Sequence, residues 1–252
     1  FMNRLENIIS LVSQYQKIDV NTLSELLQVS KVTIRKDLDK LEGKGLLHRE
    51  HGYAVLNSGD DLNVRLSFNH KTKKEIAALA ANMVSDNDTI LIESGSTCAL
   101  LAENICQTKR NVTILTNSCF IANYLREYDS CQIVLLGGEY QSSSQVTVGP
   151  LLKKMISLFH VSLAFVGTDG FDPKLGFMGR DLMRSEVAQE MANAADEVII
   201  LTDSSKFNQT ALVEQLPLST VSQVITDKHP NSEIANLFQE AEITIQSLLQ
   251  VP

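Results

Sequence analysis

The spacing of apolar residues near the amino end predicts two helices joined by a short turn. Ile34, Leu38 and Leu41 stand four and three residues apart, so a helix there carries one apolar stripe. Ser30 directly precedes this helix, and its hydroxyl can cap the helix N-terminus. Residues 20–27 have the pattern of a shorter helix, and only two residues separate it from Ser30. Helices joined by so short a turn predict a helix-turn-helix.

The segments on either side complete a winged form of this motif. Residues 46–55 have the pattern of two short strands around a turn, which predicts a hairpin wing. We therefore expect residues 1–57 to form a winged helix-turn-helix domain and the polar, turn-prone residues 58–72 to form a linker. The apolar stripe of a further, preceding helix consists of Leu5, Ile8, Ile9, Leu11 and Val12.

In residues 73–252, β-rich runs alternate with amphipathic stretches. This alternation predicts a mostly parallel sheet covered by helices on both faces, which is an α/β fold. We expect strands over residues 89–92, 112–115, 132–136, 163–166, 198–201 and 221–225. We expect helices over residues 71–84, 98–105, 120–126, 151–158 and 183–195.

The outer face of the second helix of the motif carries the groups that DNA recognition needs. Between residues 31 and 49, six Lys or Arg stand against three Asp or Glu. Cationic side chains release counterions from DNA phosphates, and a guanidinium can reach guanine in the major groove. For any one of these side chains, a solvated surface position is the alternative. We expect Ser30 to cap the helix, Thr33, Arg35 and Lys36 to lie nearest to base edges, and Lys31, Lys40, Lys44, Arg49 and His51 to meet phosphates.

The charge of the chain agrees with a small DNA-binding domain beside an acidic one. The 252 residues carry a net charge of −8, but residues 1–57 hold eight Lys or Arg against seven Asp or Glu, which leaves −9 for the remainder. No apolar run is long enough to span a membrane and no leader pattern is visible, so we expect a cytoplasmic protein. The four cysteines lack metal-ligand spacing, so we expect reduced thiols, no metal site and no cofactor.

Small polar residues follow the predicted strands at their carboxyl ends, where open parallel sheets bind ligands. Gly95-Ser96-Thr97 opens a helix, so its backbone N–H groups and the helix dipole suit a phosphate, although an ordinary helix cap is the alternative. With basic and hydroxyl-binding groups nearby, we expect a phosphorylated sugar or polyol as the effector. The expected effector-binding residues are Ser94, Gly95, Ser96, Thr97, Thr116, Asn117, Ser118, Gly137, Gly138, Asp169, Gly170, Arg180, Asp181, Arg184, Asp203 and Lys206.

The run over residues 29–54, which includes Thr-Ile-Arg-Lys-Asp-Leu and His-Gly, resembles the DNA-binding end of the DeoR family of bacterial sugar-responsive regulators. The second domain is similar to the sensor domain of that family, whose fold is similar to ribose-phosphate isomerases. The resemblance implies a phosphate loop at residues 95–97, a second ligand loop at 116–118 and a basic motif at 203–207. It also implies a bacterial, nucleoid-associated protein.

Three positions depart from the pattern of that family. Tyr53 stands where the family usually has a second glycine after His-Gly, so the tip of the wing is expected to differ. The run from Glu93 to Thr97 replaces Asp-x-Gly-Thr-Thr. Ala188 stands where the Glu-x-Val-Lys pattern has its lysine. We expect Arg180 or Arg184 to take over the anion contact of that lysine.

Two functions fit these patterns. The first is a transcriptional regulator, expected to repress genes of carbohydrate metabolism, in which a dimer or tetramer binds paired half-sites of operator DNA and the effector alters that binding. The alternative is a sugar-phosphate isomerase-like enzyme with an appended DNA-binding domain. Glu93, Asp169 and Asp203 are its candidate bases, but none stands in a sequence context typical of catalysis. The sequence therefore favours the regulator, which is not an enzyme.

Overall fold

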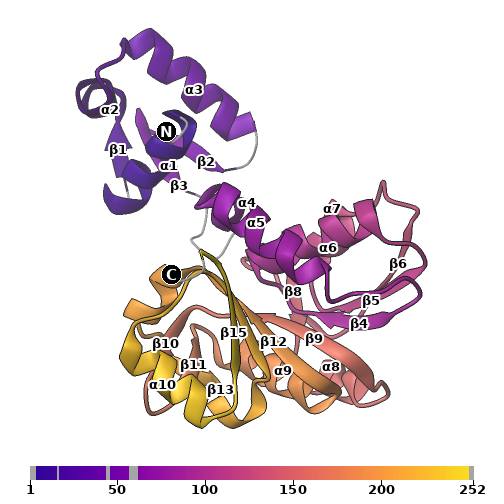
Figure 1. The fold of residues 1–252 in the computed structure, drawn as a ribbon. Helices are drawn as coiled ribbons and strands as arrows, with labels where there is room; N and C mark the ends of the chain where they lie inside the picture. Colours follow the sequence, from indigo (N-terminus) through magenta and orange to yellow (C-terminus); the bar gives the residue numbers. More distant parts are fainter. Residues whose placement is uncertain (1–3, 16, 44–45, 57–61, 250–252) are drawn as a thin grey trace. The chain divides into compact units, whose positions relative to one another are not determined.

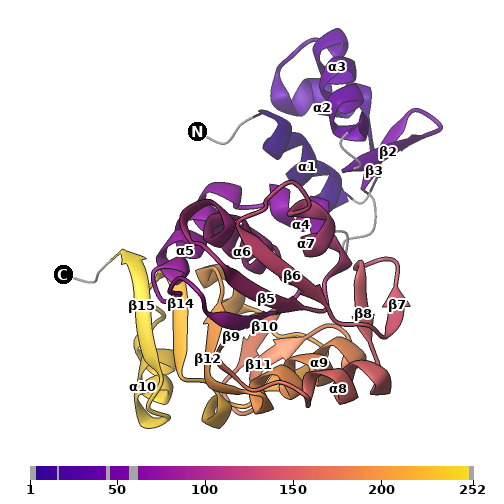
Figure 2. The ribbon, with the colours of Figure 1, turned by 90° about the vertical axis from the view of Figure 1, so that its right-hand side faces the viewer.

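The computed structural model describes residues 4–15, 17–43, 46–56 and 62–249. The chain divides into two compact units, residues 1–70 and 71–252, drawn in Figures 1 and 2. Of the predicted linker, residues 62–70 belong to the first unit, where helix α4 (Leu62–Ser67) contacts α1 (Arg4–Tyr15). Residues 57–61 lie outside the described part of the chain.

The first unit is the winged helix-turn-helix that the sequence predicts. Helix α2 (Val20–Leu27) begins at Asp19, whose carboxylate accepts hydrogen bonds from the backbone N–H groups of Asn21 and Thr22 at 2.7 and 3.2 Å. Gln28, in the left-handed region with φ of 53°, ends α2 and turns the chain toward α3 (Lys31–Gly43). The stripes of the three helices meet in one core, whose fully buried side chains include Ile8, Val12, Leu23, Ile34 and Leu38.

The wing is a hairpin of β2 (Leu47–Glu50) and β3 (Tyr53–Leu56), and β1 (Lys17–Asp19) pairs with the other side of β3. The two turn residues, His51 and Gly52, have φ of 51° and 85°, as a tight two-residue hairpin turn requires. Tyr53 already lies in β3, paired with Glu50. The turn of this hairpin therefore needs no glycine at position 53.

The second unit is built on a seven-stranded sheet, in which every neighbouring pair of strands is parallel. All six predicted strands lie in it, and the seventh, β15 (Thr244–Leu249), forms one edge. The strand order is β15-β14-β12-β9-β4-β5-β6. The other strands are β4 (Thr89–Ile92), β5 (Val112–Thr116), β6 (Cys131–Leu135), β9 (Val161–Gly167), β12 (Ala195–Leu201) and β14 (Gln223–Lys228).

Helices cover both faces of this sheet, with α5, α6 and α7 on one side and α8, α9 and α10 on the other (Figure 2). Because both faces are covered, the central strands are continuously apolar: Ile90, Leu91 and Ile92 of β4 are completely buried. The helices are α5 (His70–Ala81), α6 (Ser96–Thr108), α7 (Cys119–Tyr124), α8 (Pro150–Ile156), α9 (Leu182–Asn193) and α10 (Ser232–Glu240).

Two small antiparallel sheets lie outside the predicted pattern. One has the strand order β10-β11-β13, and the other is the hairpin of β7 and β8. Their strands are β7 (Glu139–Gln141), β8 (Val146–Val148), β10 (Gly170–Asp172), β11 (Gly176–Gly179) and β13 (Val213–Leu216), with short 3-10 helices η1 (Ser204–Asn208) and η2 (Leu218–Thr220). In the part of the chain that the structure describes, no helix has both the length and the apolar character to cross a bilayer.

The order of the central strands defines where the second unit can bind a ligand. β4 is the first strand, the chain then adds β5 and β6 on one side of it, and β9, β12, β14 and β15 follow on the other side. The direction of winding therefore reverses between β4 and β9. In open parallel sheets, ligands bind outside the carboxyl ends of the strands at such a reversal.

Candidate functional site

The N-terminus of α3 has the predicted cap. The Ser30 hydroxyl oxygen accepts a hydrogen bond from the Thr33 N–H at 3.2 Å, and the two hydroxyls lie 2.9 Å apart. Thr33 is half-buried, and its hydroxyl lies within hydrogen-bonding distance of the Ser30 hydroxyl. It sits between the apolar stripe and the outer face of α3, and its place near base edges stays a prediction.

The outer face of α3 is cationic, as predicted. The exposed basic side chains are Lys31, Arg35, Lys36 and Lys40. Val32, which sequence reasoning missed, is 60% exposed on the first turn of the same helix. An exposed aliphatic side chain beside cations is a candidate for contact with a thymine methyl group. In the sequence, Val32 can be recognised as an apolar residue of this helix that lies outside the stripe of Ile34, Leu38 and Leu41.

Arg49 holds the wing against the end of α3. Its Nη2 lies 2.6 Å from Asp39 Oδ1 and 2.8 Å from Glu42 Oε2, and its Nε donates to the same Glu42 oxygen at 2.9 Å. Its backbone N–H donates to the other Glu42 oxygen at 3.0 Å. These hydrogen bonds, the backbone one first, lower the pKa of Glu42. The carboxylates of Asp39 and Glu42 thus balance the positive charge of Arg49, which the sequence predicts to contact a phosphate.

The other predicted phosphate contacts of the wing region have different settings. The His51 side chain is 87% exposed at the hairpin turn, where it can reach a partner. Lys44 lies outside the described residues.

Inside the motif, the buried carboxylate of Asp37 accepts two hydrogen bonds from Arg4, from Nε at 2.5 Å and from Nη2 at 3.2 Å. This pair ties α1 to the inner side of α3 and fixes the direction in which the outer face points.

In the second unit, the predicted phosphate loop lies at the reversal point between β4 and β9. Gly95 is the N-cap of α6, so that helix begins without a capping side chain and its first-turn N–H groups have no intrahelical acceptor. A Cβ on Gly95 would lie 3.3 Å from the Gly167 Cα at the end of β9, so only glycine lets the two strand ends approach this closely. Ser96 and Thr97, the first helical residues, are buried beside this turn.

Glu93 fixes the shape of the loop. Its Oε2 accepts hydrogen bonds from the Gly95 N–H at 2.9 Å and from the Gly167 N–H at 3.3 Å. Its Oε1 accepts the Ser94 hydroxyl at 2.6 Å, so Ser94 serves the loop itself. The buried carboxylate joins the ends of β4 and β9.

The second predicted loop, after β5, is largely satisfied by its own contacts. Thr116 Oγ1 accepts the Ser118 N–H at 3.1 Å, and Ser118 Oγ caps α7 by accepting the Ile121 N–H at 3.1 Å. Asn117 Nδ2 donates to the Thr147 carbonyl at 3.0 Å. The buried Asn117 Oδ1 has no hydrogen-bond partner among the described residues. Asn117 is thus the member of this loop with an acceptor to offer a ligand.

The glycines after β6 and β9 are explained by packing. A Cβ on Gly138 would lie 2.5 Å from the Val148 carbonyl oxygen, and one on Gly170 would lie 2.5 Å from the Gln209 carbonyl oxygen. Both positions let two backbone segments touch, which needs no ligand. Gly137 has a looser environment, with Met155 Sδ 3.6 Å from the position of a Cβ.

The acidic and basic candidates after β9 and β11 form a second group. Asp181 caps α9 by accepting the Arg184 N–H at 2.9 Å, and Asp169 accepts the Arg180 N–H at 3.3 Å. The Arg180 side chain is exposed, whereas the Arg184 side chain is largely buried with its Nε 3.9 Å from Asp181 Oδ1. Of the two arginines proposed to replace the lysine, Arg180 is the one free to reach a ligand from solvent.

The basic motif after β12 is a capped 3-10 turn. Asp203 caps η1 by accepting the Ser205 N–H at 3.1 Å, and it also accepts the Ser205 hydroxyl. Asp227, which sequence reasoning did not single out, accepts the Ser204 N–H at 2.6 Å. Lys206 is half-buried within this turn. The carboxylate of Asp203 is therefore used to build the turn.

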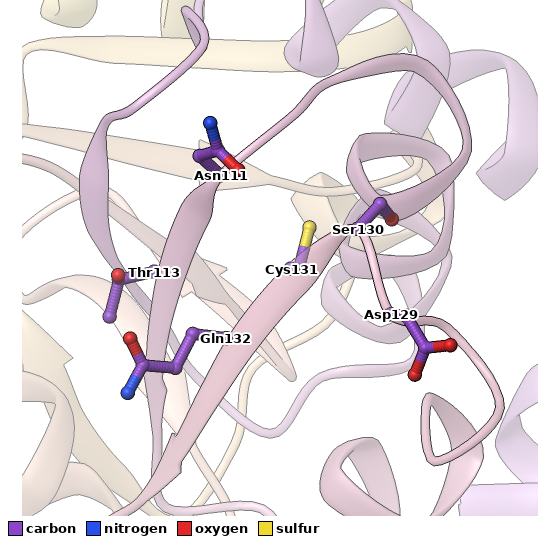
Figure 3. A pocket seen from close by; sticks show the side chains of 6 residues that line it. All are labelled: Asn111, Thr113, Asp129, Ser130, Cys131 and Gln132. Carbon is purple, nitrogen blue, oxygen red and sulfur yellow. The ribbon is translucent and has the colours of Figure 1, made fainter.

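A polar pocket of about 260 Å³ lies at the end of the sheet opposite to the predicted loops (Figure 3). Its lining comes from the amino ends of β5 and β6, whereas the predicted loops follow the carboxyl ends of strands. Because parallel sheets bind ligands at their carboxyl ends, we do not assign the effector to this pocket. The lining residues are Asn111, Thr113, Asp129, Ser130, Cys131 and Gln132.

Comparisons with known proteins match both units. Residues 4–59 match the model of the DeoR-like helix-turn-helix domain, and residues 68–228 match that of the DeoR C terminal sensor domain. The chain is 30% identical over 89% of its length to the L-fucose operon activator of Haemophilus influenzae, covering 91% of that protein. It is 28% identical over 89% of its length to the putative aga operon transcriptional repressor of Escherichia coli O157:H7, covering 86% of it.

Among solved structures, ribose 5-phosphate isomerase A of Methanocaldococcus jannaschii matches with a TM-score of 0.41 and 21% identity. The match covers 55% of each chain.

Proposed function

Because the chain belongs to the DeoR family, we propose that it is a sequence-specific transcriptional regulator whose second unit binds a phosphorylated sugar or polyol. The observation that carries the DNA-binding part is the outer face of α3, with a capped N-terminus and four exposed cations. The wing beside it is fastened by Arg49. A helix held this way can enter the major groove while the wing meets the backbone.

On this face, Thr33, Arg35 and Lys36 are the proposed base-reading residues, together with Val32. Lys31 and Lys40 are proposed to contact phosphates, as is His51 at the wing tip. A dimer or tetramer would place two such helices on paired half-sites, which is how helix-turn-helix proteins read operators. The acidic second unit would keep non-specific DNA binding weak.

The effector site is proposed at the reversal point between β4 and β9. The first-turn N–H groups of α6 would bind the phosphate, since an uncapped helix N-terminus favours an anion. Asn117 Oδ1 would accept a ligand hydroxyl. Arg180 and Lys206 would add positive charge from the neighbouring loops.

We further propose that the protein is a repressor and that its effector weakens DNA binding. One relative is named an activator and another a putative repressor, so the direction of control is a property to be measured. By linkage, an effector that weakens operator binding tenfold must itself bind tenfold more weakly to the operator complex, which is about 1.4 kcal/mol of coupling.

An isomerase-like enzyme is the less favoured function, because the three candidate bases are engaged in building loops. Glu93, Asp169 and Asp203 each accept a backbone N–H hydrogen bond at 2.9 to 3.3 Å. A general base must be free to take a proton from the substrate. These carboxylates hold the loops that surround the ligand instead.

The decisive experiment selects operator DNA from a random-sequence pool with the full chain and then adds phosphorylated sugars and polyols to the selected complex. We expect enrichment of paired half-sites and release by at least one phosphorylated compound. Failure to enrich any sequence would refute the DNA-reading proposal. Turnover of a sugar phosphate without any effect on the DNA complex would favour the enzyme.

A further inference from the structure

Two buried side chains near the phosphate loop have polar atoms that lack a partner among the described residues. They are Gln215 Oε1, on β13, and Ser185 Oγ, in the first turn of α9. The residues are only 6% and 2% exposed. Leaving such an atom unpaired in the protein interior is unfavourable, so two of them in one unit demand an explanation.

The two residues border the same point of the fold. A Cβ on Gly179, the last residue of β11, would collide with Ser185 Oγ and would lie 3.7 Å from Gln215 Cβ. Gly179 therefore leaves room for the Ser185 hydroxyl, where any larger residue would fill it. Arg180 and Asp181 follow directly and lead into α9.

Gln215 also connects this point to the phosphate loop. Its Nε2 donates to the Gly167 carbonyl at 3.1 Å, and Gly167 Cα in turn lies 3.3 Å from the position of a Cβ on Gly95. Because Nε2 is fixed in this bond, the amide is oriented and its Oε1 faces elsewhere as a pure acceptor. Gln215 thus connects the reversal point to the region beside Gly179 and the start of α9.

We propose that Gln215 Oε1 and Ser185 Oγ form a neutral subsite that binds one hydroxyl group of the effector and selects among phosphorylated polyols and sugars. This inference rests on the proposed effector site. A ligand hydroxyl satisfies both atoms, since it donates to Gln215 Oε1 and accepts from the Ser185 hydroxyl. A site that binds a hydroxyl in this way rejects a ligand that lacks it, because its own buried groups then stay unpaired.

Both oxygens are closed off from solvent, so a ligand reaches them only when neighbouring residues move. The subsite would be the deep end of the effector site, and the N-terminus of α6 its phosphate end. The two ends make different contributions: the first supplies affinity for any phosphate, and the second supplies discrimination between carbon chains.

The test measures binding to the full chain by calorimetry, with inorganic phosphate, glycerol 3-phosphate, ribitol 5-phosphate, glucitol 6-phosphate, ribose 5-phosphate, fructose 6-phosphate and glucose 6-phosphate as probes. The variants are Gln215→Leu, Ser185→Ala and their combination, and Gln132→Leu, exposed at the opposite edge of the sheet, is the matched control. We expect each single variant to weaken the tightest organic phosphate at least about tenfold, with inorganic phosphate within about twofold of the unaltered chain.

Two further readouts separate this role from a structural one. The double variant should lose less than the product of the two single losses, because both side chains bind the same hydroxyl. The melting temperature without ligand should not fall in Ser185→Ala, because the substitution removes an unpaired hydroxyl.

If both variants discriminated among the probes as the unaltered chain does, this inference alone would be overturned. A buried water molecule would then explain the two oxygens. If the unaltered chain bound neither inorganic phosphate nor any organic phosphate, the proposed effector site would fail and the inference with it.

Discussion

Arg49 separates two accounts of how the wing takes part in DNA binding. If its guanidinium contacts a phosphate, a variant without this group must release one counterion fewer when it binds DNA. If it instead fastens the wing, the number of phosphate contacts stays the same. The structure favours the second account, because Asp39 and Glu42 lie 2.6 and 2.8 Å from Nη2.

The size of the difference follows from counterion release. The logarithm of the binding constant falls with the logarithm of salt concentration with a slope of about −0.9 for each phosphate neutralised. Lys31, Arg35, Lys36 and Lys40 of α3 are exposed, so each phosphate contact among them adds about that much per subunit. We expect Arg49→Met to leave the slope unchanged and to lower affinity at every salt concentration, and Lys40→Met to reduce the slope by about 0.9 per subunit.

Fluorescence anisotropy of a labelled operator over a series of salt concentrations measures both quantities. Lys109→Met, in the second unit, is the control for loss of one positive charge elsewhere. The double variant Asp39→Asn, Glu42→Gln should release the guanidinium and make the slope steeper. A slope that falls by about 0.9 in Arg49→Met would refute the fastening role and return Arg49 to the phosphate contacts.

Three further outcomes are expected. Arg35→Ala should cost about 1–3 kcal/mol of operator binding and relax base preference at one position, measured by selection from a randomised site. Gly95→Ala should weaken inorganic phosphate binding in calorimetry, because its Cβ would press on Gly167 Cα at 3.3 Å. Hydrogen bonds from Arg49 lower the pKa of Glu42, so this carboxylate stabilises the folded first unit above its ordinary pKa and loses that effect as pH falls through the lowered value. Glu42→Gln should therefore flatten the loss of thermal stability as pH falls below the ordinary glutamate pKa, as seen in melting curves.

The sequence predicted the large elements well because each carries its own periodic signal. The stripe of Ile34, Leu38 and Leu41 predicted helix α3, and all three side chains are buried. The parallel strands were visible as apolar runs, since both faces of the sheet are covered. The small sheet of β10, β11 and β13 was missed because its strands, GFD, GFMG and VEQL, hold no apolar run like that of β4.

The contacts of the candidate sites were predictable only where residues close together in the sequence make them. The Ser30 cap follows from one hydroxyl and its neighbours in the chain. The neutralisation of Arg49 does not, because Asp39 and Glu42 reach it from another element. Likewise, Gln215 is brought to Gly167 by a strand that sequence reasoning did not recognise, 48 residues away along the chain.

At the proposed effector site, the alanine at position 188 limits which groups could hold a phosphate. Ala188 is completely buried in the apolar core beside β12, so α9 offers no cation at the place where the family pattern has its lysine. In the proposed site, the backbone of α6 would then supply most of the anion binding, since it needs no side chain. A site with fewer fixed charges depends more on neutral hydrogen bonds for its affinity. The unpaired oxygens of Gln215, on β13, and Ser185, on α9 itself, are the groups proposed to supply those bonds.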